Sequence, residues 1–136
     1  MVDTNILVYY WIPGDFSEIV EKVYLEDREW ITSPLWRYEF RNTLAGYLRK
    51  KLIAPEDAIQ LIGEAEKKME DREVGVTAAQ VVKLIGRSKC SGYDCEFVAL
   101  AENLALPLVT TDKQILSEFP AIAETPETFL KKRQSP

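Results

Sequence analysis

Four carboxylates stand out in this sequence because each lies beside a run of apolar residues. Asp3 and Asp112 end short apolar runs typical of β-strands, whereas Glu39 and Asp94 lie within or before apolar helical segments. Burying one unpaired carboxylate is costly, and gathering several adds like-charge repulsion. A divalent cation removes both penalties, so these four acids together predict a metal site.

The residue types that are missing narrow the chemistry of this site. The chain has no histidine and only two cysteines, which argues against a structural zinc site, a Ser-His-Asp triad and a histidine general base. Oxygen ligands favour Mg²⁺ or Mn²⁺, and a pair of such ions can stabilise an in-line phosphoryl displacement. We therefore predict metal-assisted hydrolysis of a phosphate ester.

Each acid taken alone also has a structural interpretation. Asp3, Asp94 and Asp112 could each be the N-cap of a helix. Glu39 could form an ion pair with Arg41 on a solvated face. If the four acids were scattered in this way, the chain would be a non-catalytic module that binds RNA or protein. The metal site therefore requires that the four carboxylates meet in one cavity.

The segments that must position these acids alternate between strand-like and helix-like patterns. Five short apolar runs predict strands: Met1–Asp3, Trp30–Thr32, Glu73–Val76, Leu108–Thr111 and Ala121–Glu124. Such alternation is typical of an α/β fold. We predict one domain over residues 1–136, with three α/β/α layers and a central, mainly parallel sheet of about five strands.

Helix signals separate these strands, with proline in a first turn or threonine at a cap marking several starts. The predicted helices run from Pro34 to about Lys51, from Pro55 to Met69, from Ala78 to Ile85 after a Thr77 cap, from Asp94 to Leu104, and onward from Pro126 after a Thr125 cap. Only Met1 and Val2 precede Asp3, whereas a strand usually has ~5 residues. We expect either a start upstream of Met1 or a truncated first strand.

Composition and charge restrict the partners. The net charge of −5 disfavours a protein that coats nucleic acid through a global positive field, so a nucleic-acid site must be local. Arg37 and Arg41 lie one helical turn apart with Glu39 between them in sequence, and are either phosphate ligands or ordinary solvated charges. The sequence has no leader pattern and no apolar run of ~20 residues, so we expect a cytoplasmic protein that does not enter a membrane.

Several short motifs resemble the PIN-domain family, and within it the VapC-type toxin ribonucleases. Each motif is weak alone, but their order and spacing are specific and span nearly the whole chain. They are Val2-Asp3-Thr4-Asn5, Glu39-Phe40-Arg41-Asn42, Tyr93-Asp94 with Val98-Ala99-Leu100-Ala101, Leu108-Val109-Thr110-Thr111-Asp112, and Ala123-Glu124-Thr125-Pro126-Glu127-Thr128-Phe129-Leu130. The chain departs from the family at Cys95-Glu96, where small or apolar residues are common. Glu96 either faces solvent or adds a fifth carboxylate near the rim.

The resemblance implies an endoribonuclease that depends on Mg²⁺ or Mn²⁺, forms a homodimer and is inhibited by a cognate antitoxin. It assigns the four acids to metal binding, with a metal-held water as the nucleophile. Asn5, Asn42 and Thr110 would then orient those carboxylates through hydrogen bonds.

Two other kinds of protein also place aspartates at strand ends. A haloacid-dehalogenase-type phosphohydrolase of small phosphate esters would need a second aspartate two residues after Asp3, and Asn5 occupies that position. A receiver domain would need an acidic pair near its first strand, which this chain lacks. Both alternatives therefore fit the sequence less well than the nuclease.

Overall fold

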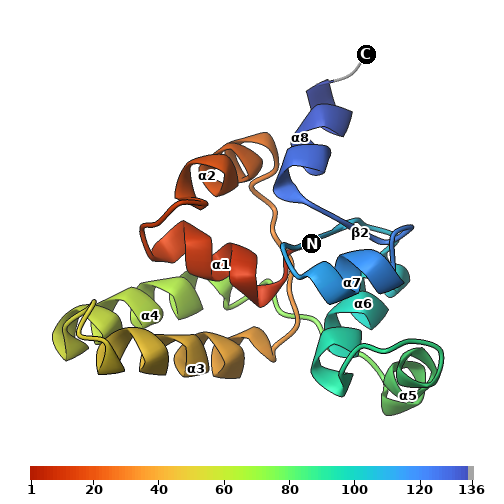
Figure 1. The fold of residues 1–136 in the computed structure, drawn as a ribbon, viewed down its shortest axis with the longest axis horizontal. Helices are drawn as coiled ribbons and strands as arrows, with labels where there is room; N and C mark the ends of the chain where they lie inside the picture. The colour runs from red at the N-terminus through yellow and green to blue at the C-terminus, as the bar shows by residue number, and fades with distance from the viewer. Residues whose placement is uncertain (135–136) are drawn as a thin grey trace.

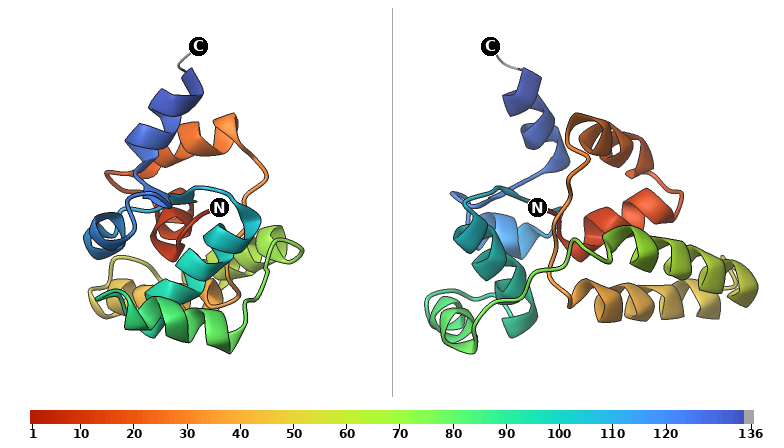
Figure 2. Two further views of the ribbon diagram at one scale, coloured as in Figure 1. Left: turned by 90° about the vertical axis from the view of Figure 1, so that its right-hand side faces the viewer. Right: turned by 180° about the vertical axis from the view of Figure 1, so that it is seen from behind.

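Helices surround a small group of parallel backbone segments in the computed structural model, which describes residues 1–134 (Figure 1). The elements in chain order are α1 (Thr4–Trp11), α2 (Ser17–Glu26), α3 (Trp36–Arg49), α4 (Pro55–Met69), α5 (Ala78–Gly86), α6 (Gly92–Leu104), β1 (Leu108–Val109), α7 (Lys113–Glu118), β2 (Ala123–Glu124) and α8 (Pro126–Gln134). In Figure 1, α1 to α4 occupy one half of the molecule and α5 to α7 the other, and the view from behind in Figure 2 shows the same division.

Five segments lie side by side where these two halves meet. β1 and β2 pair in parallel, with Leu108 opposite Ala123. On the other edge of β1, Val2 forms a parallel bridge with Val109, and the Val2 amide also donates to the carbonyl of Ile31 at 3.0 Å. Thr32 in turn bridges Glu73 in parallel. The spatial order of the segments is therefore residue 73, residue 32, residue 2, β1 and β2.

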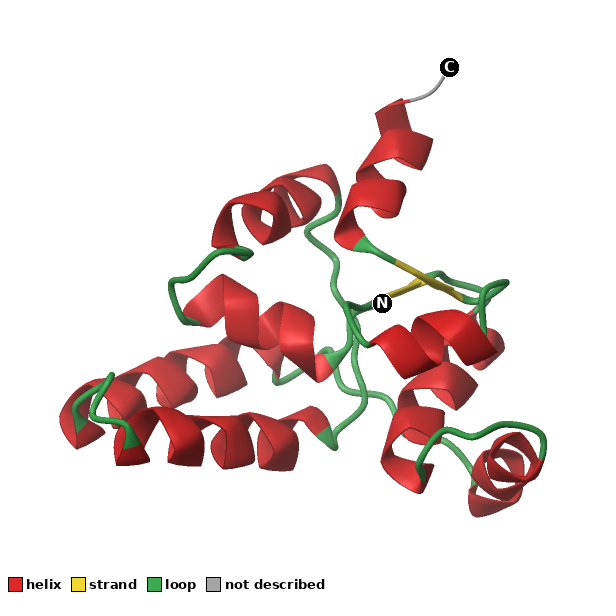
Figure 3. Ribbon diagram, in the orientation of Figure 1, coloured by secondary structure: helices red, strands yellow, loops and turns green. Residues whose placement is uncertain are grey.

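The predicted sheet of about five strands is not confirmed, because the described residues contain only two strands of two residues each (Figure 3). The other three predicted segments take part through single bridges and isolated backbone hydrogen bonds. Their shortness has a local cause at the first segment, since α1 begins at Thr4, directly after Asp3. The structure still has the predicted α/β arrangement of parallel segments and helices, but few of its residues form regular β-strands.

The predicted helices are present, with small shifts at their ends. α4 begins at Pro55 as predicted, and the Thr77 hydroxyl caps α5 by accepting from the Gln80 amide. α6 begins at Gly92 rather than at Asp94, and its N-cap is Ser91. Three further helices, α1, α2 and α7, were not predicted. Within residues 1–134, no helix is long and apolar enough to cross a membrane.

The core that fixes these elements includes large buried side chains of α3 and α6. Trp36 and Phe40 of α3 are fully buried and their rings meet edge to face at 5.6 Å. Phe97 and Leu100 of α6 are also buried, as is Leu108 of β1. Each such side chain contributes roughly 1.5–3 kcal/mol of burial free energy. The two helices that carry Glu39 and Asp94 are therefore firmly anchored.

The two cysteines are free and buried. Burial, with a smaller contribution from the charge of Asp94, raises the pKa of the Cys90 thiol to about 11. At neutral pH this thiol is protonated, so it behaves as a small apolar side chain rather than as a nucleophile.

A polar network ties α3 to the outermost of the five segments. The Arg37 guanidinium donates to both carboxylate oxygens of Glu73, at 2.7 and 2.9 Å, and the Trp36 indole N–H donates to the same carboxylate at 2.7 Å. The Glu73 side chain is only 13% exposed. Removing the Glu73 carboxylate would leave three N–H donors, on two side chains, without their acceptor in a site that water reaches poorly.

We predict that Glu73→Ala lowers the free energy of unfolding by about 1–3 kcal/mol, the usual cost of leaving buried polar groups unsatisfied. The matched control is Glu18→Ala, whose side chain is 86% exposed and pairs with Lys22 within one helix. That variant should change stability by roughly 0–1 kcal/mol. Urea denaturation of the three proteins measures both values, and equal losses in the two variants would contradict the structural role of Glu73.

Candidate active site

Asp3 occupies the centre of the site, at the end of the first parallel segment. Its side chain is 93% buried, being 7% exposed. One carboxylate oxygen accepts from the Thr4 amide at 2.7 Å and so caps α1. The other accepts from the Thr110 hydroxyl at 2.7 Å and the Asn5 amide nitrogen at 3.2 Å. The Asp3 side chain therefore both caps α1 and lies at the centre of the site.

Asn5 and Thr110 were expected to orient the carboxylates, and both contact Asp3. The Asn5 amide nitrogen also donates to the Thr110 hydroxyl at 3.2 Å, and the Asn5 oxygen accepts from the Thr111 amide at 3.3 Å. The Thr110 hydroxyl accepts from the Asp112 amide at 3.0 Å. These bonds join the start of α1 to the chain after β1, where Asp112 lies.

Glu39 approaches the site from the first turn of α3. One of its carboxylate oxygens accepts from the Thr4 hydroxyl at 2.6 Å. Thr4 thus donates its backbone N–H to Asp3 and its hydroxyl to Glu39, which fixes the two acids relative to each other. The alternative ion pair between Glu39 and Arg41 is not formed, because Arg41 pairs with Glu66.

Asp94 and Asp112 complete the acidic set from the other half of the molecule. Asp94 lies in the first turn of α6, where the helix dipole favours a negative charge. Its backbone amide donates to the Ser91 hydroxyl at 3.1 Å, so Asp94 is not the cap. Asp112 does cap a helix, since its carboxylate accepts from the Ile115 amide of α7 at 2.9 Å.

All four acids line one cavity of about 380 Å³. The other residues that line it are Thr4, Asn5, Val8, Tyr9, Thr43 and Tyr47. Asp3 and Asp112 reach the cavity from the carboxyl ends of neighbouring parallel segments, which is the edge where α/β proteins place their sites. The acids are thus gathered rather than scattered, although they come from four different parts of the chain.

Burial and mutual repulsion raise the pKa of three of these acids. Burial raises the pKa of Asp3 to about 7; the hydrogen bonds from Thr110 and Thr4 oppose the shift, and the charges of Glu39 and Asp94 add to it. Burial also raises the pKa of Glu39, as do the charges of Asp94 and Asp112. For Asp94, burial is again the largest cause, followed by the charge of Asp112. The carboxylates therefore interact across the cavity.

The cavity offers the donor chemistry that Mg²⁺ or Mn²⁺ prefers, namely several carboxylate oxygens and no histidine. Its accumulated negative charge is what a divalent cation would neutralise. Among residues 1–134, however, no three acidic or thiol side chains are arranged closely enough to hold one ion together. Such an open donor set suits Mg²⁺, which is commonly bound through one or two carboxylates and keeps several waters.

Asn42, Arg37 and Arg41 do not reach this cavity. Asn42 is exposed, and no hydrogen bond joins it to the four acids in the part of the chain that is described; Thr43 lines the cavity instead. Arg37 binds Glu73 and Arg41 binds Glu66 at 2.7 Å. Two residues along a helix correspond to a rotation of about 200°, so both arginines point away from Glu39. Their predicted role in substrate binding is not supported.

One side chain that organises the site, Thr4, was not predicted from the sequence to have this role. The signal was available, because a helix beginning directly after Asp3 places Thr4 in the first turn beside the cap. That helix was not recognised, since Ile6 to Trp11 is a run of β-branched, aromatic and apolar residues without a clear helical period. Tyr47, which also lines the cavity, has no distinguishing pattern in the sequence.

The fold and site define an α/β protein whose carboxylates converge at the ends of parallel segments. The family model of the PIN domain matches residues 1–122, so the chain belongs to the PIN-domain family, as the sequence motifs predicted. The chain is also 29% identical to Ribonuclease VapC3 of Pyrobaculum aerophilum over 126 residues, which cover 90% of this chain and 95% of that protein. This similarity supports the predicted VapC-type resemblance.

We predict that the metal-free protein loses stability as the pH rises from about 4 to about 7. The pKa of Asp3 moves from its ordinary 3.8 to about 7 on folding, so in this range the folded protein binds more protons than the unfolded chain, and the free energy of unfolding falls with pH. Urea denaturation in EDTA between pH 4.5 and 7.5 measures the slope. Asp3→Asn should reduce the slope, leaving the contributions of Glu39 and Asp94, whose pKa values are also raised. Asp15→Asn, at an exposed position, should keep the slope of the wild type. Parallel profiles for wild type and Asp3→Asn would contradict the shift.

Proposed function

We propose that this protein is a metal-dependent endoribonuclease that hydrolyses RNA phosphodiester bonds in its carboxylate cavity. The observation that carries the proposal is the convergence of Asp3, Glu39, Asp94 and Asp112 on one cavity in a PIN domain. The similarity to a protein named as a ribonuclease supports RNA as the substrate. Residues 1–136 act as a single nuclease domain in this proposal.

The four carboxylates would hold Mg²⁺ or Mn²⁺. When bound, such an ion supplies Lewis acidity and activates water for attack on phosphorus. Asn5, Thr110 and Thr4 keep Asp3 and Glu39 aimed into the cavity through the hydrogen bonds described above. Because these donors are fixed in the folded chain, the acids need little reorganisation when a cation enters.

The similarity to VapC3 also supports a proposed biological role for this chain. The chain would act as the toxin of a toxin–antitoxin pair in the cytoplasm, form a homodimer and be silenced by a cognate antitoxin. A phosphohydrolase of small phosphate esters remains the rival activity, because it could use the same acids and the same ions. The two activities differ in substrate, so the cleavage assay separates them.

We predict that the purified chain cleaves mixed cellular RNA in Mg²⁺ or Mn²⁺ and not in EDTA. Asp94→Asn should lower the rate by at least about 100-fold, since loss of a ligand exceeds the 10- to 100-fold cost of losing a supporting residue. Asp15→Asn removes one exposed acid outside the cavity and should keep the wild-type rate. Gel analysis of time courses measures all three proteins.

Equal cleavage by wild type and Asp94→Asn would reject the assigned site. Hydrolysis of a small phosphate ester without cleavage of RNA would favour the rival activity. Induced expression in a bacterial host tests the toxin role separately, because wild type should arrest growth and Asp94→Asn should not.

The Thr110 hydroxyl holds two of the four acids in place through its hydrogen bonds. Thr110→Val removes the hydroxyl that donates to Asp3 and accepts from Asp112, and should weaken Mn²⁺ binding by about 10- to 100-fold. The matched control is Thr32→Val, which removes an equally buried hydroxyl that donates to the Val2 carbonyl and touches none of the four acids. Isothermal titration calorimetry measures both affinities, and equal weakening in the two variants would argue against a role in the metal site.

A further inference from the structure

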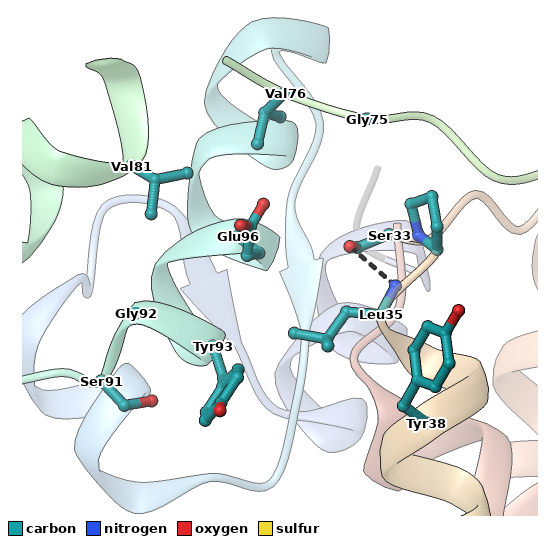
Figure 4. Close-up of a pocket in the computed structure, with 11 residues that line it drawn as sticks. Ser33, Leu35, Tyr38, Gly75, Val76, Val81, Ser91, Gly92, Tyr93 and Glu96 are labelled. Carbon is teal, nitrogen blue, oxygen red and sulfur yellow. Dashed lines mark hydrogen bonds between the residues drawn. The ribbon is translucent and has the colours of Figure 1, made fainter. Parts of the chain in front are cut away.

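A second cavity, of about 570 Å³, lies beside the carboxylate cavity and is more apolar in character. Its walls include Leu35, Tyr38, Val76, Val81, Tyr93 and Glu96 (Figure 4). Figure 4 shows Tyr93 of α6 and Tyr38 of α3 on opposite sides of this cavity, with Leu35 between them. We refer to it below as the tyrosine cavity.

The first turn of α3 and the first turn of α6 each contribute residues to both cavities. Tyr38 lines the tyrosine cavity and its neighbour Glu39 lines the carboxylate cavity. In α6, Tyr93 and Asp94 are divided in the same way. Consecutive side chains on a helix differ in direction by about 100°, which accounts for this division. A ligand held at the acids can therefore extend into the tyrosine cavity without leaving the surface of the protein.

The two tyrosines expose more of their surface than large aromatic residues usually do. Tyr38 is 64% exposed and Tyr93 is 66% exposed. The Tyr93 ring makes no aromatic or cation–π contact within residues 1–134, and Tyr38 has only the Arg41 guanidinium at 5.6 Å from its centre. Such rings are surfaces on which a flat base can stack.

Glu96 adds a polar group without a partner. It lines the tyrosine cavity and is partly buried, yet no hydrogen bond or ion pair joins it to the described part of the chain. A carboxylate in this position favours a ligand that brings N–H donors and disfavours phosphate, which carries the same charge. The occupant that fits is a base rather than the sugar-phosphate backbone.

We propose that the tyrosine cavity binds an unpaired guanine of the RNA substrate, next to the bond that is cleaved. A carboxylate has two oxygens, and guanine is the base that presents two adjacent N–H donors, N1–H and the 2-amino group, to match them. Tyr38 and Tyr93 would contact the faces of the base, and Leu35, Val76 and Val81 would exclude water around it. This inference rests on the proposed ribonuclease function and names its sequence preference.

The first arm of the test reads the preference directly. Wild type, Glu96→Gln and Glu56→Gln cleave a random-sequence RNA in Mg²⁺ or Mn²⁺, and the ends of the products are sequenced. We expect wild type to enrich guanine at one position beside the cleaved bond. Glu96→Gln should reduce that enrichment by about 5- to 150-fold, the discrimination of a bidentate base contact. Glu56→Gln changes the net charge equally at an exposed position of α4 and should keep the enrichment.

The second arm tests stacking with a short RNA that contains the preferred site. Tyr93→Ala should raise KM by about 5- to 150-fold, the range reported for loss of one stacked base, and Tyr93→Phe should restore wild-type KM because it keeps the ring. Thermal melting checks that the variants are folded. Analytical ultracentrifugation at the assay concentration reports whether either variant changes the oligomeric state.

The outcomes separate this inference from the function on which it rests. Absence of RNA cleavage by wild type would overturn both. Cleavage with the same base preference in wild type and Glu96→Gln would overturn the guanine site alone. A change of oligomeric state in Tyr93→Ala, with an unchanged base preference in Glu96→Gln, would also overturn it and would assign this face to contact between copies of the chain.

Discussion

The burial of Asp3 is the constraint on which the rest of the site depends. Asp3 follows a segment that lies between Ile31 and β1, and this placement leaves Asp3 only 7% exposed. Three donors from Thr4, Asn5 and Thr110 surround it. Even so, burial raises its pKa to about 7. The fold thus holds a carboxylate in a place where, near neutral pH, it can gain or lose a proton or accept a cation.

The structural and chemical interpretations of these acids are compatible because a carboxylate has two oxygens. Asp3 and Asp112 each cap a helix through hydrogen bonds to backbone amides, and both also line the cavity. A cap fixes the direction of the side chain while leaving lone pairs available to a cation. Capping by Asp3 and Asp112 is therefore a means of positioning them, and the caps are not evidence against a metal site.

The sequence was sufficient to predict the parts of the fold that follow from local periodicity and capping. α4 and α5 could be recognised from an amphipathic pattern and from Pro55 and Thr77 at their starts. α1 could not, because its β-branched and aromatic residues have no helical period and its stability comes from burial against the core. The predicted sheet of about five strands is not confirmed for a related reason. Apolar β-branched runs indicate extended backbone, but only tertiary pairing decides how many residues form a ladder.

The candidate site shows the same division between local and tertiary information. The four acids could be selected because an acid in an apolar stretch is unusual whatever the fold. The arginines could not be placed in this way, since the partners of Arg37 and Arg41 are Glu73 and Glu66, which lie elsewhere in the chain. The geometry of a helix does predict that Arg37 and Arg41 point away from Glu39, because each lies two residues from it.

RNA that approaches the carboxylate cavity would meet neither Arg37 nor Arg41 of α3, because both point away from Glu39. No basic residue lines the carboxylate cavity among residues 1–134, and the two nearest candidates on α3 are already neutralised by acidic partners. A phosphodiester would therefore meet a concentration of negative charge, which opposes binding as well as chemistry. In the proposed function, the four carboxylates would hold divalent cations, and neutralisation of the carboxylate charge would favour entry of the substrate backbone. Metal dependence would then affect substrate affinity as well as the rate of cleavage, and the apolar tyrosine cavity would contribute the part of the binding that does not depend on charge.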